Sequence, residues 1–205
     1  MALMSEVTRT RDDKFHERRE QLGEATLQTL AALGYARTSL REIAQNSEFS
    51  HGVLHYYFND KVDLILCSVR QYKARCVTRY DVVTVEATTA EELVENFCAK
   101  LTETLQRETS MHRLWYDLRS QSMFEPTFRP EVDQIEHSLE QMIWRVLTRY
   151  AELLGQQLQV DSSTAYALMD GLFQQALHLH VAGQVDEASE RLSAATRRLL
   201  PLIVA

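Results

Sequence analysis

Two short amphipathic segments between residues 39 and 58 constrain the fold more than any other feature of this chain. The first follows Ser39, a residue type that caps helices, and Glu42 completes a capping box three residues later. The second follows Ser50, which is another capping residue. Because apolar side chains recur on one face of each segment, we predict two short helices that pack against a shared core.

Longer helical patterns surround these two segments. One apolar stripe ends near residue 33, just before Gly34, and another begins after Asp60. Two short helices that are joined by a tight turn and braced by longer helices form a helix-turn-helix. We therefore predict a three-helix DNA-binding head at residues 13–60, preceded by a mobile polar arm at residues 1–12.

The rest of the chain, residues 61–205, is predicted to be a helical ligand-binding and dimerisation domain, which makes the fold class all-α. The whole sequence has only 6 Gly and 3 Pro, so few positions interrupt helices. Residues 81–88, DVVTVEAT, have a strand-like composition but stand alone, and we expect the fraying end of a helix followed by a loop. Further helices are expected at about 89–107, 109–123, 131–154, 162–182 and 185–199.

Charge and composition limit the class of protein. The formal net charge is −7, but residues 1–75 carry 11 Lys and Arg against 10 Asp and Glu, so the acidity lies in the remaining residues. A neutral N-terminal third permits DNA binding. No apolar run approaches the ~20 residues of a membrane helix, and three scattered cysteines do not form a disulfide framework. We expect a cytoplasmic protein with reduced thiols and no membrane partner.

The second short helix has the surface that a helix in the major groove of DNA needs. Its outer N-terminal positions, Ser50, His51 and Gly52, are small or form hydrogen bonds, and Gly52 lets the backbone approach DNA closely. Donors to phosphate oxygens would position this helix without reading the base sequence. The candidates for that role are His55, Tyr56, Tyr57 and Lys61.

The segment TSLREIAQNSEFSHGVLHYYFNDKVDLI, residues 38–65, resembles the DNA-binding signature of TetR-type transcriptional regulators. The resemblance covers residues 18–69, about a quarter of the chain. It implies an all-helical homodimer with a variable C-terminal ligand-binding domain. Most such proteins are repressors that leave their operator when a small molecule binds. The residues that match in register are Thr38, Ile43, Ala44, Ser50, Gly52, Leu54, Tyr57, Phe58, Lys61 and Leu64.

Carried over by position, the resemblance implies that His51 and Gly52, with Val53, contact bases. It also implies phosphate contacts from Thr38, Ser39, Ser50, His55, Tyr57 and Lys61. Together with Tyr56, these are the predicted DNA-binding residues.

The chain departs from the family pattern at three places. The turn between the short helices has Ser47 and Glu48 where a small residue and then glycine are usual. Without glycine, this turn needs either a strained backbone or another geometry. Val53 replaces a hydroxylated residue and His55 replaces a tyrosine, which leaves the contacts at both positions in question.

Aromatic and sulfur-containing side chains after residue 70 have two interpretations. The simpler one is that they form an ordinary core. The functional one is an apolar pocket for a largely apolar small-molecule effector of unknown identity. The predicted ligand-binding residues are Tyr72, Cys76, Phe97, Leu101, Met111, Trp115, Tyr116, Met123, Phe124 and Phe173.

The helices expected at 131–154 and 162–182 have wider apolar surfaces than one packing partner needs. Part of each surface could be core, and the excess suggests an isologous four-helix dimer interface. A dimer also presents two recognition helices one DNA turn apart, ~34 Å, which suits a palindromic operator in double-stranded DNA. The predicted interface residues are Ile135, Met142, Val146, Tyr150, Met169, Phe173 and Leu177.

The leading hypothesis is therefore a ligand-responsive, homodimeric transcriptional repressor that is not an enzyme. One alternative is a DNA-binding factor without a small-molecule effector. Another is an all-α enzyme, although the sequence has no HExxH, GxSxG or phosphate-binding glycine loop. His51 and His55, spaced i, i+4, could share a metal ion, but no third ligand is near in sequence. We expect no metal and no cofactor.

Overall fold

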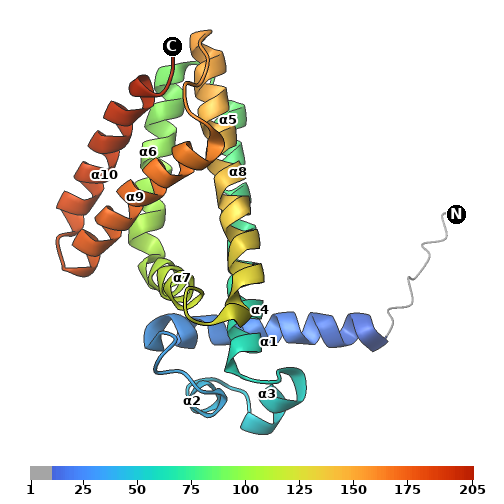
Figure 1. Cartoon of the computed structure of the whole chain (residues 1–205). Coiled ribbons are helices and arrows are strands. Elements are labelled where there is room, and N and C mark those ends of the chain that lie inside the picture. The colour runs from blue at the N-terminus through green and yellow to red at the C-terminus, as the bar shows by residue number, and fades with distance from the viewer. Residues whose placement is uncertain (1–10) are drawn as a thin grey trace, which may run out of the picture. The chain divides into compact units, whose positions relative to one another are not determined.

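Residues 11–205, which the computed structural model describes, divide into two units between Tyr72 and Lys73 (Figure 1). Most of these residues are helical and none forms a strand, which confirms the all-α prediction. Of the expected arm, residues 1–10 lie outside the described residues, while Arg11 and Asp12 belong to the first helix. No described helix combines the length and apolar character that crossing a bilayer requires.

The N-terminal unit (residues 11–72) contains three helices and the start of a fourth. The first three pack on one another. Their shared core includes Leu22, Leu30, Ile43, Leu54 and Phe58, each of which is essentially inaccessible to solvent. The helices are α1 (Arg11–Leu33), α2 (Leu40–Gln45), α3 (His51–Tyr57) and α4 (Lys61–Thr78).

Both serine caps form as predicted. The Ser39 hydroxyl accepts the Glu42 backbone N–H at 3.1 Å and donates to the Glu42 carboxylate at 3.0 Å. The Ser50 hydroxyl accepts the Val53 backbone N–H at 3.3 Å. These contacts satisfy N–H groups that have no partner within the helix, so both short helices start at defined residues.

The turn between α2 and α3 forms without glycine and without backbone strain. In the described chain, only glycines have positive φ. Asn46 ends α2 at φ −106° and ψ 13°, and its N–H donates to the Glu42 carbonyl at 3.1 Å. Its own carbonyl accepts the Thr29 hydroxyl of α1 at 3.1 Å. Of the two possibilities predicted for Ser47 and Glu48, the chain therefore adopts an unstrained turn whose geometry does not need glycine.

A guanidinium group joins three helices of the N-terminal unit. Arg19 of α1 pairs with Asp63 of α4, with the closest N···O distance at 2.5 Å, and donates to the Tyr57 carbonyl at the end of α3 at 2.8 Å. Its charged group also lies 4.7 Å from the centroid of the Phe58 ring. The hydrogen bond and charge of Asp63 raise the pKa of Arg19, although burial opposes that shift. This cluster is called the Arg19 clamp below.

The C-terminal unit (residues 73–205) is a helical domain in which α9 packs against α8, α10, α6 and α7. Figure 1 shows α9 and α10 as an antiparallel pair, joined through Gly183 at φ 88°. The chain end returns to the α8–α9 loop, where Gln157 and Ala205 exchange backbone hydrogen bonds. The helices are α5 (Asp81–Glu86), α6 (Ala90–Arg107), α7 (Thr109–Gln121), α8 (Arg129–Leu154), α9 (Ser162–Val181) and α10 (Val185–Leu199).

The prediction for residues 81–88 was wrong in one respect. Instead of a frayed helix end and a loop, residues Asp81–Glu86 form a separate short helix, α5, after α4 has ended at Thr78. Tertiary contacts explain why β-branched residues adopt this form: Val83 is buried, and Arg145 of α8 donates two hydrogen bonds to the Asp81 carboxylate. Packing has overridden a weak local propensity.

The domain boundary was predicted between residues 60 and 61, whereas the two units meet at Tyr72 and Lys73, inside α4. A single helix thus begins in one unit and ends in the other.

Replacement of Arg19 tests the clamp. Arg19→Met should lower the free energy of unfolding by about 1–3 kcal/mol, because Asp63 and the Tyr57 carbonyl both lose a half-buried donor. Urea unfolding followed by circular dichroism measures the change. Arg37→Met, which alters an exposed arginine of the same unit, should stay within about 0.5 kcal/mol of the unchanged protein. Equal stabilities for the two variants would contradict the role of the clamp.

Candidate functional site

The exposed face of α3 carries most of the predicted DNA-binding residues. Ser50, His51, Gly52 and His55 are exposed there, and Tyr56 is 65% exposed. Val53 and Tyr57 are partly exposed at its edges, as is Ser39 at the start of α2. We call Ser50, His51, Gly52, His55 and Tyr56 the α3 face.

Packing determines which side of α3 faces outward. Leu54 and Phe58 are buried in the core, so the residues between and before them point away from it. Phe15 of α1 lies against Tyr57 with ring centroids 4.9 Å apart, and Tyr57 in turn contacts Tyr56 edge to face at 4.9 Å. This aromatic stack packs the end of α3 against α1.

Two of the predicted phosphate-contacting residues are engaged inside the N-terminal unit. Thr38 is only 3% exposed, and its hydroxyl donates to the Gly34 carbonyl at 2.6 Å. The Lys61 ammonium donates to the Tyr35 carbonyl at 3.3 Å and lies 4.1 Å from the centroid of the Tyr35 ring. Thr38 therefore stabilises the turn after α1, and Lys61 holds Tyr35.

The two histidines of the α3 face lie close together. The rings of His51 and His55 meet edge to face with centroids 4.3 Å apart. Within residues 11–205, no cluster of three His, Cys, Asp or Glu side chains has the arrangement of a metal site. The pair therefore presents two imidazoles to whatever α3 contacts.

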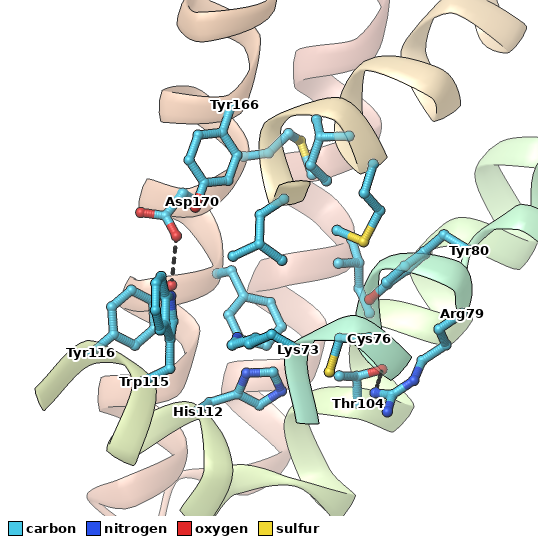
Figure 2. A pocket seen from close by; sticks show the side chains of 16 residues that line it. Lys73, Cys76, Arg79, Tyr80, Thr104, His112, Trp115, Tyr116, Tyr166 and Asp170 are labelled. Atoms are coloured by element: carbon cyan, nitrogen blue, oxygen red, sulfur yellow. Dashed lines mark hydrogen bonds between the residues drawn. The ribbon is translucent and has the colours of Figure 1, made fainter. Parts of the chain in front are cut away.

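A partly open cavity lies in the C-terminal unit, among the last residues of α4 and helices α6 to α9 (Figure 2). Its volume is about 70 Å³. Apolar side chains form one part of the wall, among them Leu139, Met142 and Ile143 of α8. Charged and hydrogen-bonding side chains form another part, and Figure 2 labels Lys73, His112 and Asp170 there.

Half of the predicted ligand-binding residues line this cavity. They are Cys76, Leu101, Trp115, Tyr116 and Phe173. Tyr72, Phe97 and Met111 are buried but do not line it. Met123 and Phe124 are 67% and 79% exposed beyond the end of α7, so they do not line it either. Met123 and Phe124 are close to Trp115 in sequence, but they follow the end of α7 at Gln121 and so do not share its inward face.

The polar lining residues were not predicted, because the sequence pattern indicated an apolar pocket. They include Lys73, Arg79, Thr104, His112 and Asp170. Lys73 could have been found, because it lies three residues before Cys76, on the apolar stripe that also contains Val69 and Tyr72. A charged residue on a buried stripe is a candidate functional residue.

Lys73 is a buried cation beside the cavity. It is 4% exposed, and its Nζ lies 4.9 Å from the centroid of the Trp115 indole. Burial lowers the pKa of Lys73, and nearby carboxylates only partly offset that effect. Burial also lowers the pKa of His112 well below its ordinary 6.5, with further lowering from the charges of Lys73 and Arg79. His112 is therefore neutral at pH 7.

The acidic groups near the cavity are held by arginines. Asp170 accepts the Tyr116 hydroxyl at 2.8 Å and pairs with Arg119 at 2.5 Å, and the same arginine pairs with Glu136 at 2.8 Å. Burial raises the pKa of Glu136, which Arg119 partly counteracts. On the other side, Glu108 holds Arg79 through two hydrogen bonds of 2.6 and 2.9 Å.

The predicted dimer-interface residues are largely used within a single chain. Ile135, Val146, Tyr150 and Leu177 are buried in the C-terminal unit, and Met142, Met169 and Phe173 line the cavity. Periodicity correctly identified a broad apolar surface, but it could not tell which neighbour covers it.

A different stripe of α9 remains accessible. It consists of Leu168, Leu172, Gln175 and Leu179, spaced four, three and four residues apart, and we call it the α9 stripe. Its last three residues line a groove together with Arg191, Ala195 and Arg198 of α10. Side chains at this spacing share one face of a helix.

Family models match both parts of the chain. Residues 22–66 match the model of bacterial regulatory proteins of the TetR family. Residues 90–201 match the model of the C-terminal domain of BetI-type transcriptional repressors.

Curated relatives and solved structures agree with these matches. The HTH-type transcriptional regulator BetI of Burkholderia thailandensis is 27% identical over 161 residues, which cover 76% of this chain and 80% of the relative. The HTH-type transcriptional repressor KstR of Mycobacterium tuberculosis is 24% identical over 64% of this chain and 59% of the relative.

A TetR transcription regulator from Haloarcula marismortui has the same fold, with a TM-score of 0.73 at 20% identity over 92% of this chain and 99% of that one. FadR from Bacillus subtilis, in complex with stearoyl-CoA, aligns with a TM-score of 0.67 at 17% identity over 89% and 95%.

Replacement of Lys73 tests whether the buried cation is costly to the fold. Lys73→Met should raise the free energy of unfolding at pH 7 by on the order of 1–3 kcal/mol, because Glu108, Glu136 and Asp170 each keep an arginine. Since the folded pKa is below the ordinary 10.5, the unfolded chain holds the proton more tightly. Wild-type stability therefore rises with pH between the lowered pKa and 10.5, and the advantage of the variant shrinks across that window.

Urea unfolding at a series of pH values from 7 to 10.5 measures this difference. Lys100→Met, on α6 outside the cavity, is the matched control and should change stability by less than about 0.5 kcal/mol. A Lys73→Met protein that is less stable than the wild type at pH 7 would show that the lysine stabilises the fold.

Proposed function

Because the chain belongs to the TetR family of bacterial regulatory proteins and has a BetI-type C-terminal domain, we propose that it is a homodimeric repressor released from its operator by a small molecule. The α3 face reads the operator, the α9 stripe forms the dimer interface, and the cavity holds the effector. The observation that carries this proposal is one continuous helix, α4, which starts beside α3 and contributes Lys73 and Cys76 to the cavity wall.

The α3 face has the chemistry of a recognition surface. His51 supplies ring nitrogens for base edges, and Gly52 has no side chain to keep the backbone from the DNA. His55 and Tyr56 are exposed donors for phosphates. Thr38 is buried and acts indirectly, by stabilising the turn after α1. Lys61 donates to the Tyr35 carbonyl, and its remaining N–H groups are the ones proposed for phosphates.

The α9 stripe is the surface that we assign to dimerisation. Its leucines are partly exposed in the single chain, which is unfavourable unless a partner covers them. Two copies related by a twofold axis would bring α9 against α9 and form a helical bundle. We therefore propose the α9 stripe as the dimer interface in place of the buried residues that were predicted from the sequence.

The cavity and α4 supply a route from effector to DNA. A ligand changes the equilibrium between two conformations only if it binds one of them more tightly. A ligand beside Lys73 and Cys76 contacts the end of α4 directly, so it is positioned to favour one placement of that helix. FadR of Bacillus subtilis was solved with stearoyl-CoA, but about 70 Å³ holds no long acyl chain, and the effector proposed here is smaller.

The alternative of a DNA-binding factor without an effector is less well supported. A domain whose only task is dimerisation would gain stability from an apolar core, whereas this one keeps Lys73 and several ion pairs around a cavity. Membership in a family of transcription regulators also favours binding over turnover, so we propose that the chain is not an enzyme.

Selection from random DNA tests operator recognition. The wild-type protein should enrich a palindromic site and bind it with an affinity that falls steeply with salt. His51→Ala should reduce the preference for that site over unrelated DNA by about tenfold or more, since one base contact contributes about 1–3 kcal/mol. His137→Ala, which changes an exposed histidine of α8, should leave the preference intact. Failure of the wild type to enrich any site would overturn the proposed function.

A charge placed on the α9 stripe tests the dimer. Leu172→Asp should raise the dissociation constant of the dimer by about tenfold or more, because a charged carboxylate would replace an apolar contact and lose its water in the interface. Operator affinity should fall in parallel. Sedimentation equilibrium and fluorescence anisotropy measure the two quantities. Val85→Asp, at an α5 position that is 80% exposed, should change neither. A dimer that survives Leu172→Asp would place its interface elsewhere.

A further inference from the structure

The α3 face has no Lys or Arg, although it is the surface proposed to read DNA. Residues 49–59 contain neither residue type. The next lysine along the chain, Lys61, donates to the Tyr35 carbonyl, and Arg19 is paired with Asp63. Attraction between basic side chains and phosphates supplies much of the affinity of a protein for DNA. Further cations for DNA binding therefore have to come from another part of the N-terminal unit.

Three exposed basic residues follow one face of α1. Arg11, Lys14 and Arg18 are spaced three and four residues apart, so they lie on the same side of the helix. We call these three residues the α1 basic stripe. Most acidic side chains of α1 follow another face with similar spacing, namely Asp13, Glu17, Glu20 and Glu24. The basic side chains are therefore gathered on one side of α1.

Two contacts place the α1 basic stripe beside α3. The guanidinium carbon of Arg18 lies 5.6 Å from the centroid of the Phe49 ring, and Phe49 directly precedes the capping residue of α3. One turn earlier on α1, the Phe15 ring lies 4.9 Å from that of Tyr57 and 6.1 Å from that of Tyr56, between centroids. Both ends of α3 are thus in contact with the part of α1 that carries the stripe.

The dimensions of the stripe suit the backbone of DNA. All three side chains are exposed, and Arg18 donates to the neutral amide of Gln21 at 3.0 Å. Arg11 and Arg18 are seven residues apart, which is ~10 Å along the helix axis. One strand of DNA has about three phosphates over that length, at ~3.4 Å each along the duplex axis. The stripe therefore matches a short run of phosphates.

We propose that the α1 basic stripe binds the phosphate backbone of double-stranded DNA beside the major groove that receives α3. This inference rests on the proposed function of the α3 face, and it adds a second contact surface outside the helix-turn-helix. Phosphate contacts carry no base information directly, so the stripe supplies affinity while His51 and Gly52 supply the sequence preference. Because Phe15 packs against the end of α3, phosphates held by the stripe also position the recognition helix.

Removal of two charges from the stripe tests this contact in the full-length protein. Combined Arg11→Gln and Lys14→Gln should weaken binding to the selected operator and to unrelated DNA by the same factor, about tenfold or more. The slope of log affinity against log salt concentration should become shallower by about 2 to 4, since each lost phosphate contact removes ~0.9 and a dimer loses two contacts per substitution. Fluorescence anisotropy at a series of salt concentrations measures both quantities.

Two further variants control for charge and for structure. Combined Lys100→Gln and Arg107→Gln removes the same charge from α6 and should keep the wild-type slope. Combined Arg11→Lys and Lys14→Arg keeps both charges on α1 and should retain wild-type affinity and slope. Ethylation of single phosphates gives a direct readout: phosphates whose modification blocks the wild type beside each half-site should no longer matter to the stripe variant.

The inference is overturned if the Gln variant of the stripe keeps the wild-type slope, if the α6 control loses as much slope, or if the charge-preserving variant loses as much affinity. Its failure is distinguishable from failure of the proposed function. If the wild type enriches an operator and the stripe variant binds it equally well, the proposed function stands and the stripe is excluded. If the wild type enriches no site but the stripe variant loses affinity and slope on any DNA, the stripe stands and the proposed function fails.

Discussion

The Arg19 clamp is the interaction on which the N-terminal unit depends. One guanidinium contacts the end of α3, the start of α4 and the ring of Phe58. Because α3 has only seven residues, its own hydrogen bonds could not hold it in place or even keep it helical. The direction in which His51 and His55 point is therefore a consequence of tertiary contacts. The same clamp fixes the start of α4, the helix that continues into the C-terminal unit.

Whereas the Arg19 clamp stabilises the fold, the residues around the cavity lower its stability. Around Lys73, the chain accepts a buried charge and an unsatisfied indole N–H, where apolar side chains would stabilise the fold more. Such conflicts between stability and local chemistry concentrate at functional sites. The arginines that hold Asp170, Glu136 and Glu108 limit the cost, because they pair three carboxylates in the same region.

The elements that could be predicted from sequence are those encoded over a few neighbouring residues. Ser39 and Ser50 cap their helices because each hydroxyl needs only a backbone N–H three residues ahead. The prediction for residues 81–88 was wrong, because the helix there is stabilised by Val83 burial and by Arg145, which is 64 residues away from Asp81. The α9 helix was predicted with nearly its observed bounds, yet the division of its apolar residues between core, cavity and outer stripe was not.

The sequence by itself determined the helical fold, the helix-turn-helix and the family, because these follow from caps, periodicity and a motif in one continuous segment. Only the tertiary structure decided the candidate sites. It buried Thr38, moved Met123 and Phe124 outside the cavity, and brought Lys73 next to Trp115 from another helix. The physical reason is that burial and charge pairing depend on which helices meet. Residues 42 positions apart come into contact only after the chain has folded, and no local pattern records that contact.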